Sequence, residues 1–185
     1  MSEIPNHPVY SKNVLEMLMV ANDYCNFMAK AETYTKQQMF DYLLKVAPLL
    51  YIKGSLLPDI TVQNPDAVEK FLHEEEWEAL FKAMQKVFKK DDEFWFIDNS
   101  DFSENTPIKA SLSESLADVY QDMKDFVILY QKSSLDAKEN AVHELKRLFE
   151  SNWGYRLVNA HKALHYLNLN GRQEEGKSVN ADLLF

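Results

Sequence analysis

Two histidines, His161 and His165, lie four residues apart in a stretch over 152–168 that otherwise has the pattern of a helix. Side chains at this spacing point the same way, and zinc or iron sites use it when a carboxylate from a neighbouring helix completes the ligand set. No further ligand is evident, because the chain has neither a Glu-x-x-His nor a His-Glu-x-x-His motif. On a helical wheel both histidines flank the apolar stripe beside Val158. We therefore expect the edge of a packing face and predict no metal site.

A row of carboxylates is the second candidate for chemistry. Its members are spaced four, four and three residues apart on one expected helix and share a face: Glu114, Asp118, Asp122 and Asp125. Such a row could recruit a basic partner, but charged rows on amphipathic helices commonly face solvent, where ion pairs contribute only about 0 to 1 kcal/mol each. We interpret the row as a solvated face, partly paired with Lys124 or with Lys146 and Arg147 of the next helix.

An aromatic cluster interrupts the helical pattern, with Trp95 between Phe94 and Phe96 in a non-periodic connector over 91–110. Binding residues are over-represented in such segments. In a helical protein the cluster either lines a groove for a ligand or partner, or plugs the end of the bundle. We favour the plug, because aromatic side chains readily enter cores.

Familiar catalytic signatures are missing from the sequence. Serine nucleophile elbows, phosphate loops and dinucleotide fingerprints need glycines, and the chain has only four, none of them in such a motif. Cys25 is the only cysteine and lies in an apolar stretch, so it indicates a core residue in a reducing compartment. We predict no catalytic residue and no cofactor.

Composition bounds the class of protein. The chain has 185 residues, of which 46% are hydrophobic, and this suffices for one globular domain. Its formal net charge of −9 repels a phosphate backbone, so we do not expect direct nucleic-acid binding. The N-terminal segment lacks the pattern of a secretory signal, and Glu16 and Asp23 interrupt the most apolar early stretch. We therefore expect a cytoplasmic protein without a membrane span.

The expected elements are helices with apolar stripes at helical spacing. Capping boxes are predicted at Thr35 with Gln38 and at Ser111 with Glu114. A first helix over about 11–30 is apolar nearly all round, which predicts a central position. The last helix is expected to stop at Asn170 and Gly171. The sequence thus predicts an all-α, single-domain bundle of about six or seven helices over 1–170, with the connector at 91–110 and a loose tail over 171–185.

The stretches "NWGYRLVNAHKALHYLN", "HEEEWEALFKAMQKVF", "DDEFW" and "SLSESLADVYQDMKDFVILYQ" resemble a bacterial family called DUF5063. The resemblance covers most of the chain and implies an all-helical cytoplasmic protein with no assigned reaction and no catalytic residues to transfer. The family pattern is similar at Trp153, Gly154, Arg156, Leu157, Val158 and His165. His161 matches an apolar position in that pattern, which further disfavours a metal. Family genes near RNA-modifying and exonuclease genes also suggest an accessory role in nucleic-acid processing.

Three functional hypotheses follow from these features. The leading one is a non-catalytic protein-interaction or adaptor module with an unknown protein partner, for which a homo-oligomer is also allowed. The second is a small-ligand-binding protein or metal-dependent enzyme whose pocket lies between the 91–110 connector and the last helix. Its candidate residues are Trp95, Trp153, Arg156 and His165. The third is the accessory factor in nucleic-acid processing.

Overall fold

The computed structural model of the chain describes residues 6–67, 69–97 and 106–182, the stretch from 171 onward as backbone only. This part of the chain contains six α-helices: α1 (Lys12–Met28), α2 (Lys36–Ser55), α3 (Glu74–Phe88), α4 (Leu112–Gln131), α5 (Leu135–Leu148) and α6 (Gly154–Asp182). A π-helical segment, Phe149–Trp153, joins α5 to α6, so the six segments form five separate rods. The predicted all-α class is confirmed, with a helix count at or just below the expected range.

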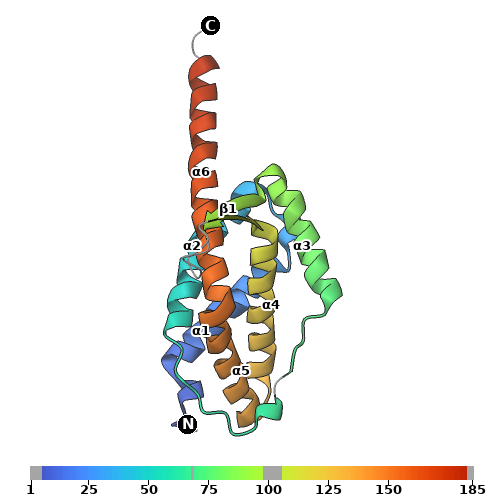
Figure 1. Ribbon diagram of the computed structural model, residues 1–185, viewed down its shortest axis with the longest axis vertical. Helices are drawn as coiled ribbons and strands as arrows, with labels where there is room; N and C mark the ends of the chain where they lie inside the picture. The colour runs from blue at the N-terminus through green and yellow to red at the C-terminus, as the bar shows by residue number, and fades with distance from the viewer. Residues whose placement is uncertain (1–5, 68, 98–105, 183–185) are drawn as a thin grey trace.

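The helices are arranged around α4. This helix packs against α1, α3, α5 and α6, and α2 lies against both α1 and α6 (Figure 1). Twelve of the twenty residues of α4 are buried, which makes it the central helix of the bundle. The prediction of a central first helix is wrong, because α1 leaves Leu15 and Met19 exposed to solvent.

The expected irregular connector over 91–110 contains a two-stranded antiparallel sheet. Strand β1 (Glu93–Ile97) pairs with β2 (Pro107–Ser111), with Trp95 opposite Lys109. Side chains alternate along β1, so that Phe94 and Phe96 are half-buried while Trp95 is 65% exposed. Phe94 packs against the core, as expected of a plug, whereas Trp95 does not.

A buried carboxylate fastens this sheet to the central helix. Asp92 is 6% exposed, and its Oδ1 accepts hydrogen bonds from the backbone N and the hydroxyl of Ser113, at 2.8 Å and 2.5 Å. Its Oδ2 accepts a hydrogen bond from the Ser111 hydroxyl at 2.8 Å. Since Ser111 also caps α4 by accepting from the backbone N of Glu114, one network sets the strand and the start of the helix together.

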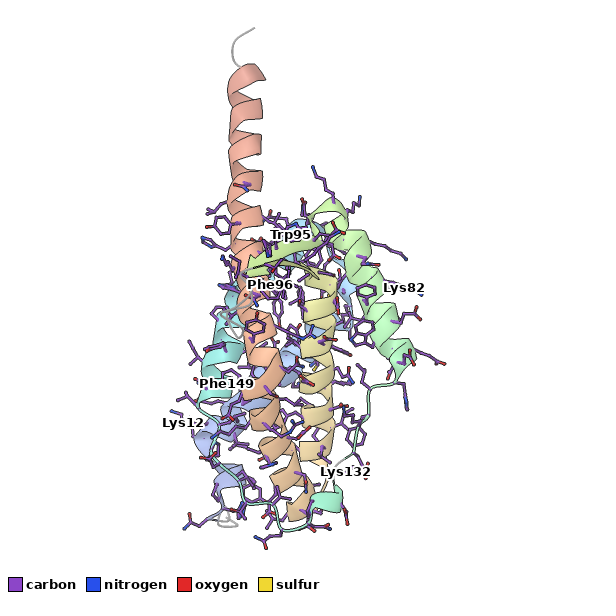
Figure 2. The ribbon with its side chains drawn as sticks, in the orientation of Figure 1. Lys12, Lys82, Trp95, Phe96, Lys132 and Phe149 are labelled. Carbon is purple, nitrogen blue, oxygen red and sulfur yellow. The ribbon has the colours of Figure 1, made fainter. Side chains whose placement is uncertain are left out.

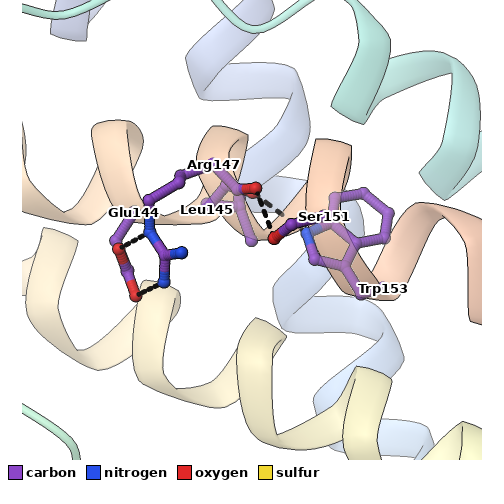
Figure 3. Close-up of polar contacts among 5 residues, drawn as sticks. All are labelled: Glu144, Leu145, Arg147, Ser151 and Trp153. Carbon is purple, nitrogen blue, oxygen red and sulfur yellow. Dashed lines mark hydrogen bonds and ion pairs between the residues drawn. The ribbon is translucent and has the colours of Figure 1, made fainter.

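The joint between α2 and the α5–α6 rod is built on one tryptophan. Trp153 is fully buried, and its indole N–H donates to the backbone carbonyl of Leu145 at 3.0 Å (Figure 3). The ring lies against Gly54 of α2 so closely that a Cβ on Gly54 would meet Trp153 Cζ2 at 2.9 Å and Phe149 Cδ2 at 2.8 Å. Only glycine therefore fits at position 54 without displacing aromatic rings.

The last helix does not stop where the sequence predicts. It continues past Asn170 and Gly171 through Asp182, and its final turns extend beyond the body of the molecule (Figure 1). The predicted looseness of residues 171–185 stays a prediction. Nowhere among the described residues does a helix reach the length and hydrophobicity that crossing a bilayer would require.

Substitution of Gly54 tests the α2–α6 joint. We expect Gly54→Ala to lower the free energy of unfolding by about 2 kcal/mol, because overpacking against Trp153 outweighs the better helix propensity of alanine. Urea denaturation measures this difference. The neighbouring exposed residue provides a control, and Ser55→Ala is expected to change stability by less than about 0.5 kcal/mol. Equal stability of the two variants would contradict the close approach.

The backbone conformation of Lys89 provides a second test of the fold. This residue has φ 52° and ψ −123°, and it is the one non-glycine residue with positive φ in the described chain. Such a conformation costs on the order of 1 kcal/mol for a side chain larger than glycine. We expect Lys89→Gly to raise the melting temperature, measured by calorimetry, while Lys90→Gly in the same turn lowers it. If both variants are destabilised alike, Lys89 is not strained.

Candidate functional site

The four residues proposed from the sequence lie in different surroundings. Trp153 is a core residue, and His165 is an exposed residue of α6. Arg156 points to the central helix, where its Nη1 lies 2.8 Å from Asp118 Oδ2. Trp95 stands on β1 (Figure 2). The structure therefore brings no two of these four side chains into one pocket within the described residues.

A pocket does lie between the connector and the last helix, but other residues form most of it. It has a volume of about 240 Å³, and the residues that line it are Glu93, Phe94, Trp95 and Phe96 of β1 and Asn159, Lys162, Ala163, Tyr166 and Leu167 of α6. Trp95 is thus the one member of the predicted set that contributes. The hollow is smaller than typical ligand sites of about 300 to 1,000 Å³ and suits a single aromatic group or peptide side chain.

His161, the first histidine of the pair, lies at the edge of a groove between α2 and α6. His161 is half-buried and its Nδ1 is buried without a hydrogen-bond partner among the described atoms, whereas His165 is exposed. Burial lowers the pKa of His161, and the neighbouring charge of His165 lowers it further. Across the described residues no three His, Cys, Asp or Glu side chains are grouped as metal ligands. The burial of His161 agrees with the packing-edge interpretation.

The carboxylate row on α4 contacts α3 through Asp118 and the segment before α3 through Asp125, and the interpretation as a solvated face holds only for Glu114. Asp118 accepts a hydrogen bond from Trp77 Nε1 at 3.0 Å, in addition to its ion pair with Arg156. Asp125 Oδ1 accepts from the backbone N of Phe71 at 2.7 Å and of Leu72 at 3.0 Å. The predicted pairing also differs, because Lys146 binds Asp59 and Arg147 binds Glu144 (Figure 3).

Asp122, between these two, has no such compensation. Its Oδ2 is buried without a hydrogen-bond partner among the described atoms, beside a hollow of about 30 Å³, enough for one water. Burial, followed by the charges of Asp118 and Asp125 and a smaller effect of Glu144, raises the pKa of Asp122 from 3.8 to about 7 against the opposing charge of Lys70. Ionisation of Asp122 within the row is therefore unfavourable, because the carboxylate is partly buried and lies beside two others.

Exposed apolar side chains gather on the side of the molecule formed by α2 and its two neighbours. At its centre lies a groove of about 220 Å³ lined by Ala47, Pro48, Tyr51, Ile52, Leu157, Val158 and His161. We call this surface the α2 face; its exposed apolar residues are Leu15 and Met19 of α1, Leu49, Tyr51, Ile52 and Leu56 of α2, and Val158 of α6. Helical spacing places Leu49 and Leu56 beside Ile52, so the patch is continuous along α2.

Charges on the α2 face are mainly positive. Lys45 and Lys53 flank Leu49 at helical spacing, and Lys53 Nζ lies 2.6 Å from Glu16 Oε2 of α1. Lys12 approaches the same carboxylate at 3.7 Å. The face thus combines an apolar centre with a cationic edge in a chain of net charge −9.

Sequence reasoning missed this surface and the state of Asp122. Tyr51 and Ile52 continue an apolar run in α2, and a residue count in that helix shows more apolar positions than one packing stripe requires. That excess is a usable signal for the α2 face. No comparable signal exists for Asp122, because its burial depends on the loop that leads into α3.

Together these features define a small helical-bundle protein whose described residues form a β-ribbon, a half-buried acidic row and an exposed apolar face. The chain belongs to the DUF5063 family, described as a domain of unknown function, which it matches over residues 8–170. The crystal structure of protein BF1032 from Bacteroides fragilis is similar, with 31% sequence identity, a TM-score of 0.78, and coverage of 87% of this chain and 95% of that one. No curated protein matches the chain.

Asp122 yields a test of pH dependence. Its pKa in the folded protein is about 7, above the ordinary 3.8, so folding loses stability as pH rises through this window. We expect Asp122→Asn to stabilise the protein by about 2 kcal/mol at pH 8, after allowing for partial solvent screening, and to change little at pH 4. Denaturant titrations at both pH values measure the difference. Glu114→Gln, an exposed control on α4, should show no such trend; an Asp122→Asn effect independent of pH would contradict the assignment.

Proposed function

We propose that the protein is a non-catalytic interaction module of the cytoplasm that binds an amphipathic helix of a partner protein on the α2 face. The observation that carries this proposal is the exposed apolar stripe along α2 with a groove between α2 and α6, together with further exposed apolar side chains on α1 and α6, the two helices that pack against α2. Monomeric proteins rarely expose large contiguous apolar patches unless these bind something.

The shape of the α2 face favours a helix as its ligand. A groove of about 220 Å³ accepts one or two large apolar side chains, and the apolar stripe along α2 offers contacts on either side of it. Helices bind such grooves through anchors spaced three and four residues apart. Tyr51, Ile52 and Val158 would surround the central anchor.

Charge favours an acidic partner over a second copy of this chain. Lys12, Lys45 and Lys53 border the apolar residues, and a helix with carboxylates at its edges would complement them. A symmetric pairing of two α2 faces would instead bring like lysines together. The homo-oligomer is therefore the less favoured arrangement and serves as an outcome of the test.

Two further features support a non-catalytic role in a reducing compartment. Burial raises the pKa of Cys25 to about 12, so its thiol is not available as a thiolate nucleophile. Within the described residues, the carboxyl group with the most strongly raised pKa, Asp122, lies beside a hollow of only about 30 Å³, too small for a substrate. A single buried cysteine fits the cytoplasm, where disulfides are rare.

Small-ligand binding is a second candidate function, and the pocket between β1 and α6 favours it. Three consecutive aromatic residues and Tyr166 surround this hollow, and Lys162 and Asn159 add polar groups. Such a lining suits a flat aromatic group. A thermal-shift screen with aromatic metabolites, comparing Trp95→Ala with the native chain, tests this candidate, because a ligand of the native state raises the melting temperature.

Site-specific crosslinking tests the helix-binding function. A photo-reactive amino acid at Met19, which is 71% exposed, should form a crosslink in cells to an acidic amphipathic helix of another protein. Adding Ile52→Glu should reduce the crosslink yield by about tenfold or more, because a charge then occupies the groove. Mass spectrometry identifies the crosslinked peptide.

The matched control is the same probe at Ile108 of β2, an exposed apolar residue away from the α2 face. Equal crosslinking from Ile108 would contradict a specific site. Crosslinks only between two copies of this chain would replace the proposed partner by a homodimer, and crosslinks insensitive to Ile52→Glu would exclude the groove.

A further inference from the structure

A cleft of about 520 Å³ lies between the start of α2 and the end of α3, apart from the α2 face and from the β1–α6 pocket. The short turns η2 (Ala31–Thr33) and η4 (Lys89–Asp91) border it. We call it the lysine cleft, after the four lysines that line it: Lys36, Lys86, Lys89 and Lys90. It is more than twice the volume of the pocket beside Trp95.

The lysine cleft is cationic in an acidic protein. Four lysines face two carboxylates, those of Glu32 and Asp91, while the whole chain carries −9. Lys36 already binds Asp91, whereas none of the ion pairs found in the described chain involves Lys86, Lys89 or Lys90. These three ammonium groups are therefore available to an anion.

The helix dipole of α3 explains only some of the lysines in the cleft. Cations are favoured in the last turn of a helix, and this explains a lysine at position 86 of α3. It does not require Lys89 to adopt a positive φ that glycine would adopt without strain. Strained backbone conformations of this kind concentrate at binding sites, where the surrounding structure maintains them. Here the turn at Lys89 returns the chain toward Lys36 through Asp91.

The cleft also has an apolar lining. Ala83, Val87 and Phe88 of α3 contribute to it, together with Tyr34 from the segment before α2. A ligand that contacts both the lysines and the apolar lining has at least two negative charges and an attached apolar or aromatic group. Phosphate fits the charged part best, because lysine ammonium groups bind it as point charges without requiring fixed geometry. A volume of about 520 Å³ lies in the range of small-molecule sites.

We propose that the lysine cleft binds a phosphorylated small molecule carrying an apolar or aromatic group. The N-terminus of α2 does not supply this site, since Thr35 and Gln38 already cap it reciprocally. A nucleic-acid strand fits less well, because three glutamates, Glu74, Glu75 and Glu76, occupy the first turn of α3 and would repel a continuation along that helix.

Isothermal titration of the full chain at low ionic strength tests this site with naphthyl phosphate, inorganic phosphate and naphthol as probes. Naphthyl phosphate should bind more tightly than the other two, since it alone satisfies both parts of the cleft. The variant K86Q/K89Q/K90Q should weaken its binding by about tenfold or more. These lysines make no ion pairs in the described chain, so the melting temperature should stay within a few degrees of that of the native protein.

The control K70Q/K109Q/K124Q removes the same number of charges away from both the lysine cleft and the α2 face, and its affinity should stay within about twofold. Equal weakening in both variants would show general charge attraction and overturn the site. So would equal affinity for inorganic phosphate and naphthyl phosphate, or no binding of either. Tighter, lysine-dependent binding of a single-stranded oligonucleotide would replace the proposed ligand by nucleic acid.

Discussion

The close contact between Trp153 and Gly54 is the constraint on which the arrangement of the bundle depends. It lies where α5 passes into α6 through a π-helical segment, and the indole N–H binds the carbonyl of Leu145 within that same rod. A full-size side chain at position 54 would separate α2 from α6. Because the α2–α6 groove is bounded by these two helices, the largest residue of the core and the smallest residue of α2 together set its width.

The acidic row on α4 is the second organising feature. Asp118 and Asp125 bind groups of α3 and of the segment before it, and they thereby attach the outermost helix to the central one. Asp122 lies between them at the distance of one helical turn, and its buried Oδ2 has no hydrogen-bond partner among the described atoms. Its raised pKa is the cost of placing three carboxylates in a half-buried row. The opposite end of α3, which this attachment positions, forms one wall of the lysine cleft.

The surfaces of the molecule differ in charge. Most of the acidic excess is spread over the exterior, whereas lysines concentrate at the edge of the α2 face and in the lysine cleft. Both surfaces combine cations with apolar side chains, a composition suited to amphipathic anionic ligands. The two proposed ligands differ in size, a helix for the open face and a small phosphorylated molecule for the cleft. Under these proposals, a protein without a recognisable catalytic motif would carry two specific binding sites.

The sequence alone determined the all-α class, the family and the features encoded within a few residues. The capping box at Thr35 and Gln38 forms as predicted, and Ser111 caps α4, because such signals need only the backbone of the next turn. The apolar stripes likewise marked the cores of the helices. A helix past Gly171 and the strand pair β1–β2 were not foreseen. The Asn-Gly pair is a local stop signal that α6 does not obey, and the strands depend on pairing between two segments that the sequence pattern does not mark.

Only the tertiary structure decided which polar residues are buried and which apolar ones remain exposed. The same row of carboxylates reads as a solvated face until α3 covers it, because helical periodicity defines faces but not the element that each face meets. Arg156 finds Asp118 from a distant part of the chain, and Trp95 turns outward through its pairing in the sheet. Contacts between distant segments depend on the complete packing of the bundle, and no short stretch of sequence encodes them.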